Sequence, residues 1–167
     1  MSSANDVLII GTGGTFDKSY DAVRERLAFG EPSSLPRILK EAHLRGCSFN
    51  DVMRLDSLDM TDSHRKTLAK CILDDKRSRF VVVHGTSRLV ETGIFLSDKI
   101  VDRTVVLTGA LCPFLYSETE ASANLGGAIG VSRILNHGVY LFMHGRVFSP
   151  NNCQKNARTG VFEELNC

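Results

Sequence analysis

The chain has 167 residues, of which 43% are hydrophobic and 23% charged, a composition typical of one globular domain. Its formal net charge of +1 gives no sign of a nucleic-acid surface, and no apolar run approaches the roughly 18 residues that span a membrane. Because the amino terminus also lacks the basic and apolar regions of a secretory signal, we expect a cytoplasmic protein whose single domain covers residues 1–167.

The first half of the chain alternates apolar runs with helical patterns. Asp6–Ile10 is a short apolar segment that ends at Gly11 and indicates a buried strand. Three further elements are expected in this half: a helix from Ser34 to about Arg45, a weaker strand over Phe49–Leu55, and a helix that Thr61 and Asp62 cap.

Strands in the second half are apolar throughout, as strands buried on both faces are. Arg79–Val83 is the clearest of them. The later elements are a helix over Leu89–Ile100, a strand over Arg103–Leu107, a helix over Ser117–Asn136, and a last strand over Gly138–Met143 with a turn at Gly145 and Arg146. Strands that alternate with helices predict an α/β fold, with a doubly wound parallel sheet between two helical layers (three-layer α/β/α).

Three glycine-containing segments directly follow predicted strands. In a doubly wound sheet, ligands bind beyond the carboxyl ends of the strands, near the point where the strand order switches. We therefore expect the ligand site to be built from Gly11–Thr15, His84–Ser87 and Thr108–Ala110.

Thr12 stands between glycines at the end of the first predicted strand. Such glycines let the backbone turn sharply, and their amide hydrogens can stabilise an oxyanion. A threonine placed there can act as a nucleophile when a base activates it. Two other interpretations are a tight turn with a capping hydroxyl and a phosphate cradle. The cradle is disfavoured because the third glycine of the dinucleotide fingerprint and the Walker lysine are absent.

Thr86 and Ser87 follow the clearest strand and start the next helix, where amide hydrogens and the helix dipole favour a negative charge. Either residue also suits a simple N-cap, and His84 is typical of a buried structural histidine. Lys155 lies in a polar segment and on its own would be a solvated lysine. Enclosed in a cleft, it would lose its proton more readily and act as a base.

The cysteines offer no metal or redox motif. They are odd in number, widely separated and without a CxxC pair: Cys47, Cys71, Cys112, Cys153 and Cys167. We interpret them as reduced thiols in a cytoplasmic protein, and we expect neither a metal nor a cofactor.

Taken together, these segments resemble the bacterial-type L-asparaginases. Gly11–Phe16 resembles the first signature of that family, T-G-G-T, and His84–Ser87 resembles the start of the second, H-G-T-D-T-M-x-E-T. Thr108–Ala110 and Asp56–Met60 resemble two further family motifs. The resemblance covers nearly the whole chain and implies the fold of the family's amino-terminal catalytic domain.

The resemblance also implies a set of site residues. The expected catalytic residues are Thr12 as the acylated nucleophile, Thr86 as the second threonine, Lys155 as the catalytic lysine, and Tyr20 as the tyrosine supplied by the amino-terminal loop. The expected substrate contacts are Gly13, Ser57, Asp59, Ser87 and Ala110.

Ser87 departs from the family pattern, in which an aspartate at this position holds the α-ammonium group of the substrate and orients the lysine. A serine supplies no negative charge, and a charge-assisted hydrogen bond is worth about 1.5–3 kcal/mol. We therefore expect discrimination for an α-amino acid to fall roughly ten- to a hundredfold. Arg88 stands where the family has a small threonine, and its added positive charge favours an anionic or less amino-acid-like substrate.

The family's carboxyl-terminal domain has no counterpart in this sequence, so the chain resembles the short, one-domain members. In two-domain relatives a partner subunit completes each site. We expect this chain to close its site with its own loops or with another copy, as a homo-oligomer. The alanine- and glycine-rich Ala121–Gly130 suits such an interface, and equally suits close packing against the sheet of its own subunit.

The resemblance therefore implies an asparaginase-like amidohydrolase that converts a small amide, L-asparagine or a related compound, to the acid and ammonia. Thr12 would attack with help from Tyr20, and backbone amides would hold the oxyanion. Thr86 and Lys155 would then activate the water. The alternative is a catalytically weak or inactive module of the same fold that binds a small metabolite, which the absence of a charge at Ser87 favours.

Overall fold

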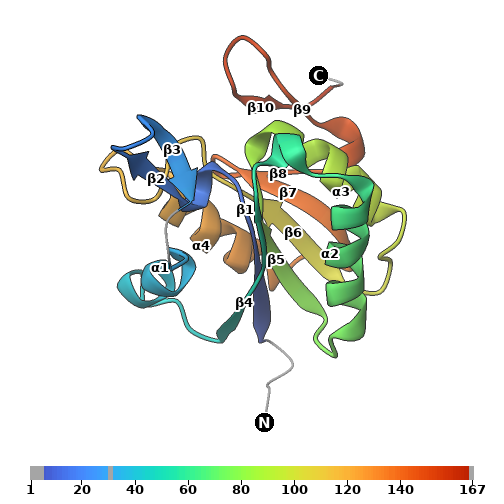
Figure 1. Ribbon diagram of the computed structural model, residues 1–167. Helices are drawn as coiled ribbons and strands as arrows, with labels where there is room; N and C mark the ends of the chain where they lie inside the picture. The colour runs from blue at the N-terminus through green and yellow to red at the C-terminus, as the bar shows by residue number, and fades with distance from the viewer. Residues whose placement is uncertain (1–5, 30–31, 166–167) are drawn as a thin grey trace.

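A six-stranded sheet forms the centre of the molecule (Figure 1). The structure is a computed structural model that describes residues 6–29 and 32–165. The strands run across the sheet in the order β4 (Cys47–Leu55), β1 (Val7–Gly13), β5 (Arg79–Val83), β6 (Thr104–Thr108), β7 (Gly138–Met143) and β8 (Arg146–Phe148). All neighbours are parallel except β8, which is antiparallel to β7.

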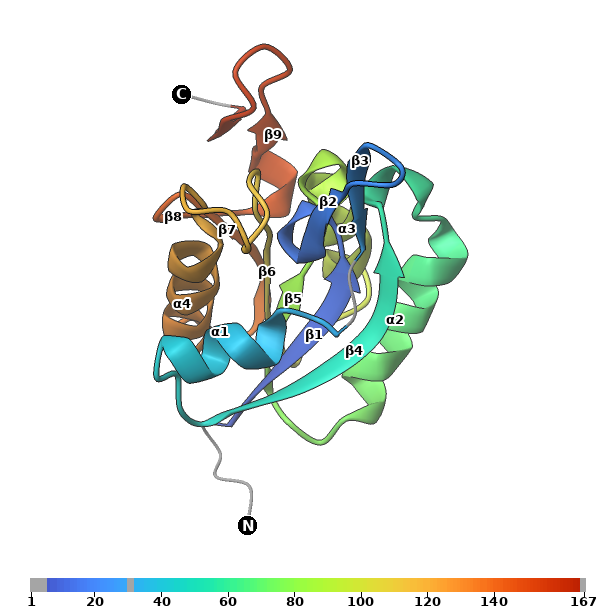
Figure 2. The same ribbon diagram turned by 60° about the vertical axis from the view of Figure 1, so that its left-hand side comes forward.

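Helices cover both faces of this sheet, so the molecule has three layers (Figures 1 and 2). One face carries α1 (Leu35–Glu41) and α4 (Ala121–Ser132), and the other carries α2 (Asp62–Asp74) and α3 (Leu89–Ser97). Thr61 caps α2 through reciprocal hydrogen bonds with His64, in agreement with the predicted cap. Within the described ranges, no helix combines the length and the apolar character that crossing a bilayer requires.

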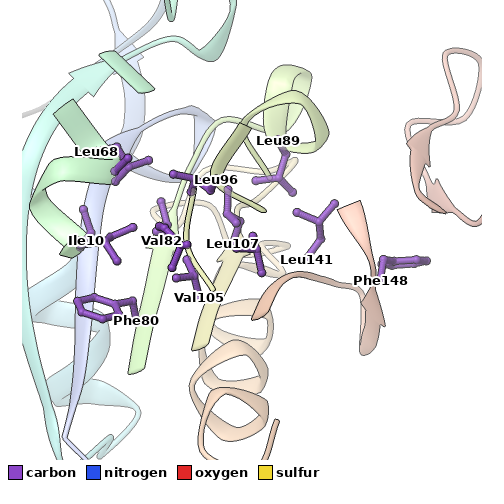
Figure 3. Packing of buried hydrophobic residues seen from close by; sticks show 14 of the residues in the cluster. Ile10, Leu68, Phe80, Val82, Leu89, Leu96, Val105, Leu107, Leu141 and Phe148 are labelled. Carbon is purple, nitrogen blue, oxygen red and sulfur yellow. The ribbon is translucent and has the colours of Figure 1, made fainter. Parts of the chain in front are cut away.

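Successive residues of the central strands face opposite helical layers, which produces two cores. Ile10 and Val82 belong to the core beneath α2 and α3 (Figure 3). Their neighbours Ile9 and Val81 belong to the core beneath α1 and α4. Because both faces of these strands are buried, their sequences are apolar throughout, and the loops at their ends start from fixed positions.

The predicted three-layer α/β fold is confirmed, with corrections at one edge of the sheet. Gly138–Met143 is not the last strand, because His144 and Gly145 adopt φ angles of 51° and 78° and turn the chain into β8. The sheet is therefore parallel, as predicted, except at this edge, where β8 runs antiparallel to β7. The helix predicted over Ser117–Asn136 is also shorter, since α4 occupies only its middle part.

Two small hairpins were not predicted from the sequence. One pairs β2 (Lys18–Asp21) with β3 (Arg26–Phe29), and the other pairs β9 (Gln154–Lys155) with β10 (Phe162–Glu163). Both lie at the same end of the molecule as the carboxyl ends of the central strands (Figure 1). Their strands are short and contain few buried residues, so they carry no apolar run that marks a strand.

The connection through α4 differs in hand from the other connections. The steps from β5 to β6 through α3 and from β6 to β7 through α4 move in the same direction across the sheet. Their helices lie on opposite faces, so the two steps have opposite hands (Figure 1). The steps through α1 and α2 share the hand of α3. Because parallel crossovers are nearly always right-handed, the α4 connection is the exception.

Candidate active site

Three loops meet at the carboxyl edge of the sheet, as the sequence predicted. Strand pairing places Gly11 beside Val83 and Val83 beside Thr108, so β1, β5 and β6 end side by side. The strand order also switches here, because the chain continues from β1 to β4 on one side and later to β5 on the other. A doubly wound sheet builds its ligand site at such an edge.

Glycines let two of these loops approach each other more closely than other residues would. Gly13 and Gly14 have φ angles of 97° and 77°, in the left-handed region that favours glycine. A Cβ atom on Gly14 would lie only 2.4 Å from the Cα atom of Gly85. This backbone-to-backbone contact brings the residues that follow, Thr15 and Thr86, into neighbouring parts of the edge.

The structure argues against Thr12 as the nucleophile. Thr12 lies within β1, is 0% exposed, and donates a hydrogen bond from its Oγ1 to the carbonyl oxygen of Val83 at 2.9 Å. An enclosed hydroxyl that is already bonded within the sheet does not reach a substrate. Thr12 instead ties the ends of β1 and β5 together, which corrects the role that the sequence implied.

Thr15 is the accessible threonine of the same loop. It follows the two left-handed glycines, opens the 3₁₀ turn η1 (Thr15–Asp17), and is half-buried. Phe16 behind it is completely buried, and its carbonyl oxygen accepts a hydrogen bond from the Phe114 amide at 3.1 Å. The backbone of this turn is therefore anchored while Thr15 itself remains partly open to solvent.

Thr86 and Lys155 form a hydrogen-bonded pair although 69 residues separate them. The Nζ atom of Lys155 lies 2.8 Å from Oγ1 of Thr86, which is buried at the start of the 3₁₀ turn η3 (Thr86–Arg88). Burial lowers the pKa of Lys155 from its ordinary value, because desolvation disfavours the charged form. Such a lysine is suited to exchange a proton with the hydroxyl beside it.

Lys155 reaches this position because the chain folds back over α3 after β8. The 3₁₀ turn η4 (Pro150–Asn152) packs on α3, where a Cβ atom on Gly93 would lie 3.1 Å from the ring of Pro150. Lys155 follows on β9 and pairs with Phe162 of β10, whose side chain is buried in the core. The polar segment that holds Lys155 is thus a hairpin anchored at both ends.

Ser57 lies against the loop that carries Thr86. It is buried in the 3₁₀ turn η2 (Ser57–Asp59), and a Cβ atom on Gly85 would lie 2.6 Å from its Oγ atom. Asp56 caps this turn by accepting a hydrogen bond from the Leu58 amide at 3.0 Å. Ser57 is therefore positioned at the same edge as Thr86, and its role as a substrate contact stays a prediction.

The other predicted substrate contacts differ in accessibility. Ser87 and Asp59 are exposed, so their side chains are free to meet a ligand. Gly13 and Ala110 are buried and have no polar side-chain atoms, so only their backbone groups can contribute. Their roles as contacts stay predictions.

Tyr20 projects from the β2–β3 hairpin rather than into the edge of the sheet. It is 59% exposed and pairs with Leu27 of β3. In the described chain its hydroxyl makes no hydrogen bond with Thr12 or Thr15. The role of Tyr20 as a catalytic residue stays a prediction.

The carboxylate nearest in sequence to Ser87 is held by two arginines. Glu91 Oε2 lies 3.1 Å from Nη1 of Arg88 and 3.3 Å from Nη2 of Arg65. Glu91 therefore does not replace the charge that an aspartate at position 87 would supply. The same contact compensates the charge of Arg88, which corrects the expectation that Arg88 makes the site more positive.

His84 is a buried, uncharged histidine that supports the Thr86 loop. Its Nδ1 atom lies 2.7 Å from the carbonyl oxygen of Gly85, and its Nε2 atom lies 3.0 Å from Sδ of Met60. Burial lowers the pKa of His84 to about 4, and the nearby charge of Arg65 acts in the same direction. The structural interpretation of His84 fits this environment.

Four cysteines lie in the described ranges, and all are free thiols: Cys47, Cys71, Cys112 and Cys153. Burial raises the pKa of Cys153 to about 11, which keeps this thiol protonated at neutral pH. Within residues 6–29 and 32–165, no group of three or more His, Cys, Asp or Glu side chains is arranged to hold a metal ion.

Two features of the site were not predicted from the sequence. Thr15 was overlooked in favour of Thr12, although a threonine that follows a pair of glycines is a better candidate for an open turn. The ion pair between Lys18 and Asp56 joins distant segments and has no local signal in the sequence.

Comparisons with known proteins agree on one family. A family model described as "Asparaginase, N-terminal" matches residues 6–165. The chain is 29% identical to L-asparaginase 2 of Escherichia coli K12, over 96% of this chain and 50% of that protein. It is 28% identical to a probable periplasmic L-asparaginase of Haemophilus influenzae, over 93% of this chain and 48% of that protein. The chain thus spans about half the length of the curated relatives it matches.

Solved structures match the fold over the same extent. The thermostable L-asparaginase from Thermococcus kodakarensis superposes with a TM-score of 0.82 at 24% identity, covering 97% of this chain and 52% of that one. A probable cytoplasmic L-asparaginase from Campylobacter jejuni gives a TM-score of 0.82 at 25% identity, and the match covers 96% of this chain and 53% of that one. The three-layer architecture is therefore shared with these proteins.

Proposed function

Because the chain belongs to the asparaginase amino-terminal family, we propose that it is an amidohydrolase acting on a small amide, L-asparagine or a related compound. The hydrogen bond between Lys155 and Thr86 is the observation that carries this proposal. A lysine with a lowered pKa, bonded to a buried hydroxyl, is suited to proton transfer. Thr15, half-buried after two glycines in the adjacent loop, is the nucleophile of the proposed reaction.

The proposed reaction has two steps. Oγ1 of Thr15 attacks the amide carbon, and backbone amides of the glycine loop stabilise the oxyanion. The hydroxyl proton passes through Thr86 and Lys155 to the leaving nitrogen, so ammonia departs and an acyl-enzyme ester remains. Water that gives up its proton to the same pair then cleaves the ester, which releases the acid and restores Thr15. Ser57 binds a polar group of the substrate, and the scheme uses no metal or cofactor.

A second candidate function is a binding module of the same fold that turns over its ligand weakly or not at all. Ser87 is neutral and exposed, and the nearby Glu91 is held by Arg88 and Arg65. The start of η3 therefore offers no uncompensated carboxylate to an α-ammonium group. An amino-acid amide would be held less firmly there than an amide without that group.

Ammonia release from three amides separates these candidates. L-Asparagine, L-glutamine and succinamate, which is asparagine without its amino group, are compared for the wild type, Ser87→Asp and the uncharged control Ser87→Asn. We expect Ser87→Asp to raise kcat/KM for L-asparagine relative to succinamate roughly ten- to a hundredfold, and Ser87→Asn to leave the ratio unchanged. If only Ser87→Asp releases ammonia, the binding module is favoured. If neither the wild type nor either variant releases ammonia, the amidohydrolase is rejected.

We further propose that the protein is cytoplasmic and assembles as a homo-oligomer. The outer side of α4 supports assembly, because Cβ atoms on Gly126 and Gly130 would meet open space and a second copy has room to approach. The inner side packs within the subunit, where a Cβ atom on Gly127 would lie 2.2 Å from the ring of Phe142. Sedimentation velocity tests the assembly, and a strict monomer would contradict it. Cell fractionation tests the compartment.

A further inference from the structure

Lys18 and Asp56 form an ion pair that joins two segments of the candidate site. The Nζ atom of Lys18 lies 2.5 Å from Oδ2 of Asp56, across 38 residues of sequence. The side chains are only 14% and 36% exposed. The ammonium group also lies 5.3 Å from the centre of the Phe29 ring, which adds a cation–π contact. Two separate contacts thus hold the head group of Lys18 in place.

Each partner is attached to a segment that carries a proposed site residue. Lys18 directly follows η1, which begins at Thr15, and Asp56 directly precedes Ser57. The two carboxylate oxygens of Asp56 have different partners, because Oδ1 accepts from the Leu58 amide and Oδ2 binds Lys18. Both contacts lower the pKa of Asp56, the hydrogen bond from Lys18 most, so the carboxylate is charged at neutral pH. Asp56 therefore couples the shape of η2 to the position of η1.

The β2–β3 hairpin has few other contacts that fix it beside the site. A two-stranded hairpin is only marginally stable by itself. In the described chain the remaining side-chain hydrogen bonds of the hairpin are internal, and the bond from Lys18 is the one that reaches η2. The rear of the preceding turn is held separately, since Asp17 accepts a hydrogen bond from the Ser34 amide at 2.6 Å. The turn is also tied to the segment before Ser57, because the Gly14 amide donates a hydrogen bond to the Leu55 carbonyl oxygen at 2.9 Å and Arg54 Nη2 lies 3.9 Å from Oδ2 of Asp17. The ion pair therefore fixes the hairpin, which begins at Lys18, rather than the turn itself.

We propose that Lys18 and Asp56 form a positioning clamp that holds the β2–β3 hairpin beside the part of the site where Thr15 and Ser57 meet a small substrate. This inference rests on the proposed function, because it assumes that both residues contact one substrate. The clamp takes no part in making or breaking bonds. When it is broken, the hairpin samples positions in which the site is too wide, and apparent affinity falls in proportion to the competent fraction. KM then rises while kcat at saturation is preserved.

Single and double variants test the clamp. Asp56→Asn removes the charge but keeps the oxygen that caps η2, and Lys18→Met removes the ammonium group but keeps the stem of the side chain. Each is expected to raise KM for the amide substrate about tenfold, with kcat changed less than about twofold. The double variant should be no worse than either single variant, because both break the same contact. Lys18→Arg should retain most of the wild-type KM.

A matched control removes an ion pair elsewhere. Lys70→Met breaks an exposed pair with Asp74 on α2 and is expected to leave KM unchanged. Hydrogen exchange provides a readout that needs no turnover: amides of residues 18–29 should exchange faster in Asp56→Asn than in the wild type. Unchanged exchange, or effects on KM that add in the double variant, would overturn the clamp.

The clamp can also be tested if the proposed amidohydrolase activity is absent, so failure of the two proposals can be told apart. If the wild type hydrolyses none of the amides, the Kd for L-aspartate, the acid that the proposed reaction would release from L-asparagine, replaces KM as the measured quantity. A Kd about tenfold weaker in Asp56→Asn, together with faster exchange, then supports the clamp although the amidohydrolase is rejected. An equal Kd in the two proteins overturns the clamp.

Discussion

The hydroxyl groups at the carboxyl edge have different surroundings that depend on their distance from the strand ends. Thr12 is still inside β1 and bonds to the backbone of β5. Thr86 lies beyond β5, in a buried turn, and is paired with Lys155. Thr15 lies beyond two left-handed glycines and is partly exposed. A hydroxyl bonded within the sheet stabilises the fold, whereas a hydroxyl past the turn is available for chemistry.

The lowered pKa of Lys155 predicts the pH dependence of turnover. As a base Lys155 must be unprotonated, so kcat/KM should rise with pH and level off above an apparent pKa below 10.5, the ordinary value for lysine. Lys155→Met should remove this limb and lower kcat by about 10²–10⁴. Lys155→Arg is the control, because it keeps the positive charge and should lose the same activity. Rate profiles with the same rising limb in wild type and Lys155→Met would exclude Lys155 as the base.

At the scale of elements, backbone contact between loops fixes the site. An alanine at position 14 would need a positive φ, and its Cβ atom would meet the backbone of Gly85. Gly14→Ala should therefore lower the free energy of unfolding by at least about 2 kcal/mol and displace Thr15, with loss of activity. Urea unfolding and ammonia release measure both effects.

Gly145→Ala is the matched control for this prediction. Gly145 also has a positive φ, of 78°, but a Cβ atom there would meet open space. This substitution should lower the free energy of unfolding by only about 1 kcal/mol and leave activity unchanged, because it strains the backbone without a collision. If both variants behave alike, close contact at Gly14 is not what shapes the site.

The same scale explains which parts of the structure the sequence could predict. Central strands such as β5 and β7 are buried on both faces, so their apolar runs mark them directly. The first strand was predicted to end at Ile10 but continues to Gly13, and this difference of three residues assigned Thr12 to the loop instead of the strand. The hairpins, and the contact of Lys155 with Thr86, depend on pairing between distant segments, which no local pattern records.

At the scale of the whole molecule, His84 predicts the response to acid. The pKa of His84 is about 4 in the folded protein and 6.5 in ordinary surroundings. Between these values the unfolded chain binds a proton that the folded chain does not, so the free energy of unfolding should fall as pH decreases from 6.5 to about 4. The loss from this one group is at most about 3 kcal/mol.

Urea unfolding at about pH 7 and about pH 4.5 measures this loss. His84→Gln does not titrate and should make the dependence on pH shallower, even if the variant is less stable at both pH values. His137→Gln changes an exposed histidine and should keep the wild-type dependence. An equal dependence in wild type and His84→Gln would show that other groups control stability in acid.

In the proposed reaction Thr15, and not Thr12, is the nucleophile, and Thr86 and Lys155 complete the site. Ammonia release from L-asparagine and succinamate by wild type, Thr15→Ala and Thr12→Val tests it most directly, with circular dichroism to confirm folding. We predict that Thr15→Ala lowers kcat at least about 10³-fold, while Thr12→Val stays active and loses only about 1 kcal/mol of stability. A fully active Thr15→Ala, or a folded but inactive Thr12→Val, would contradict the claim.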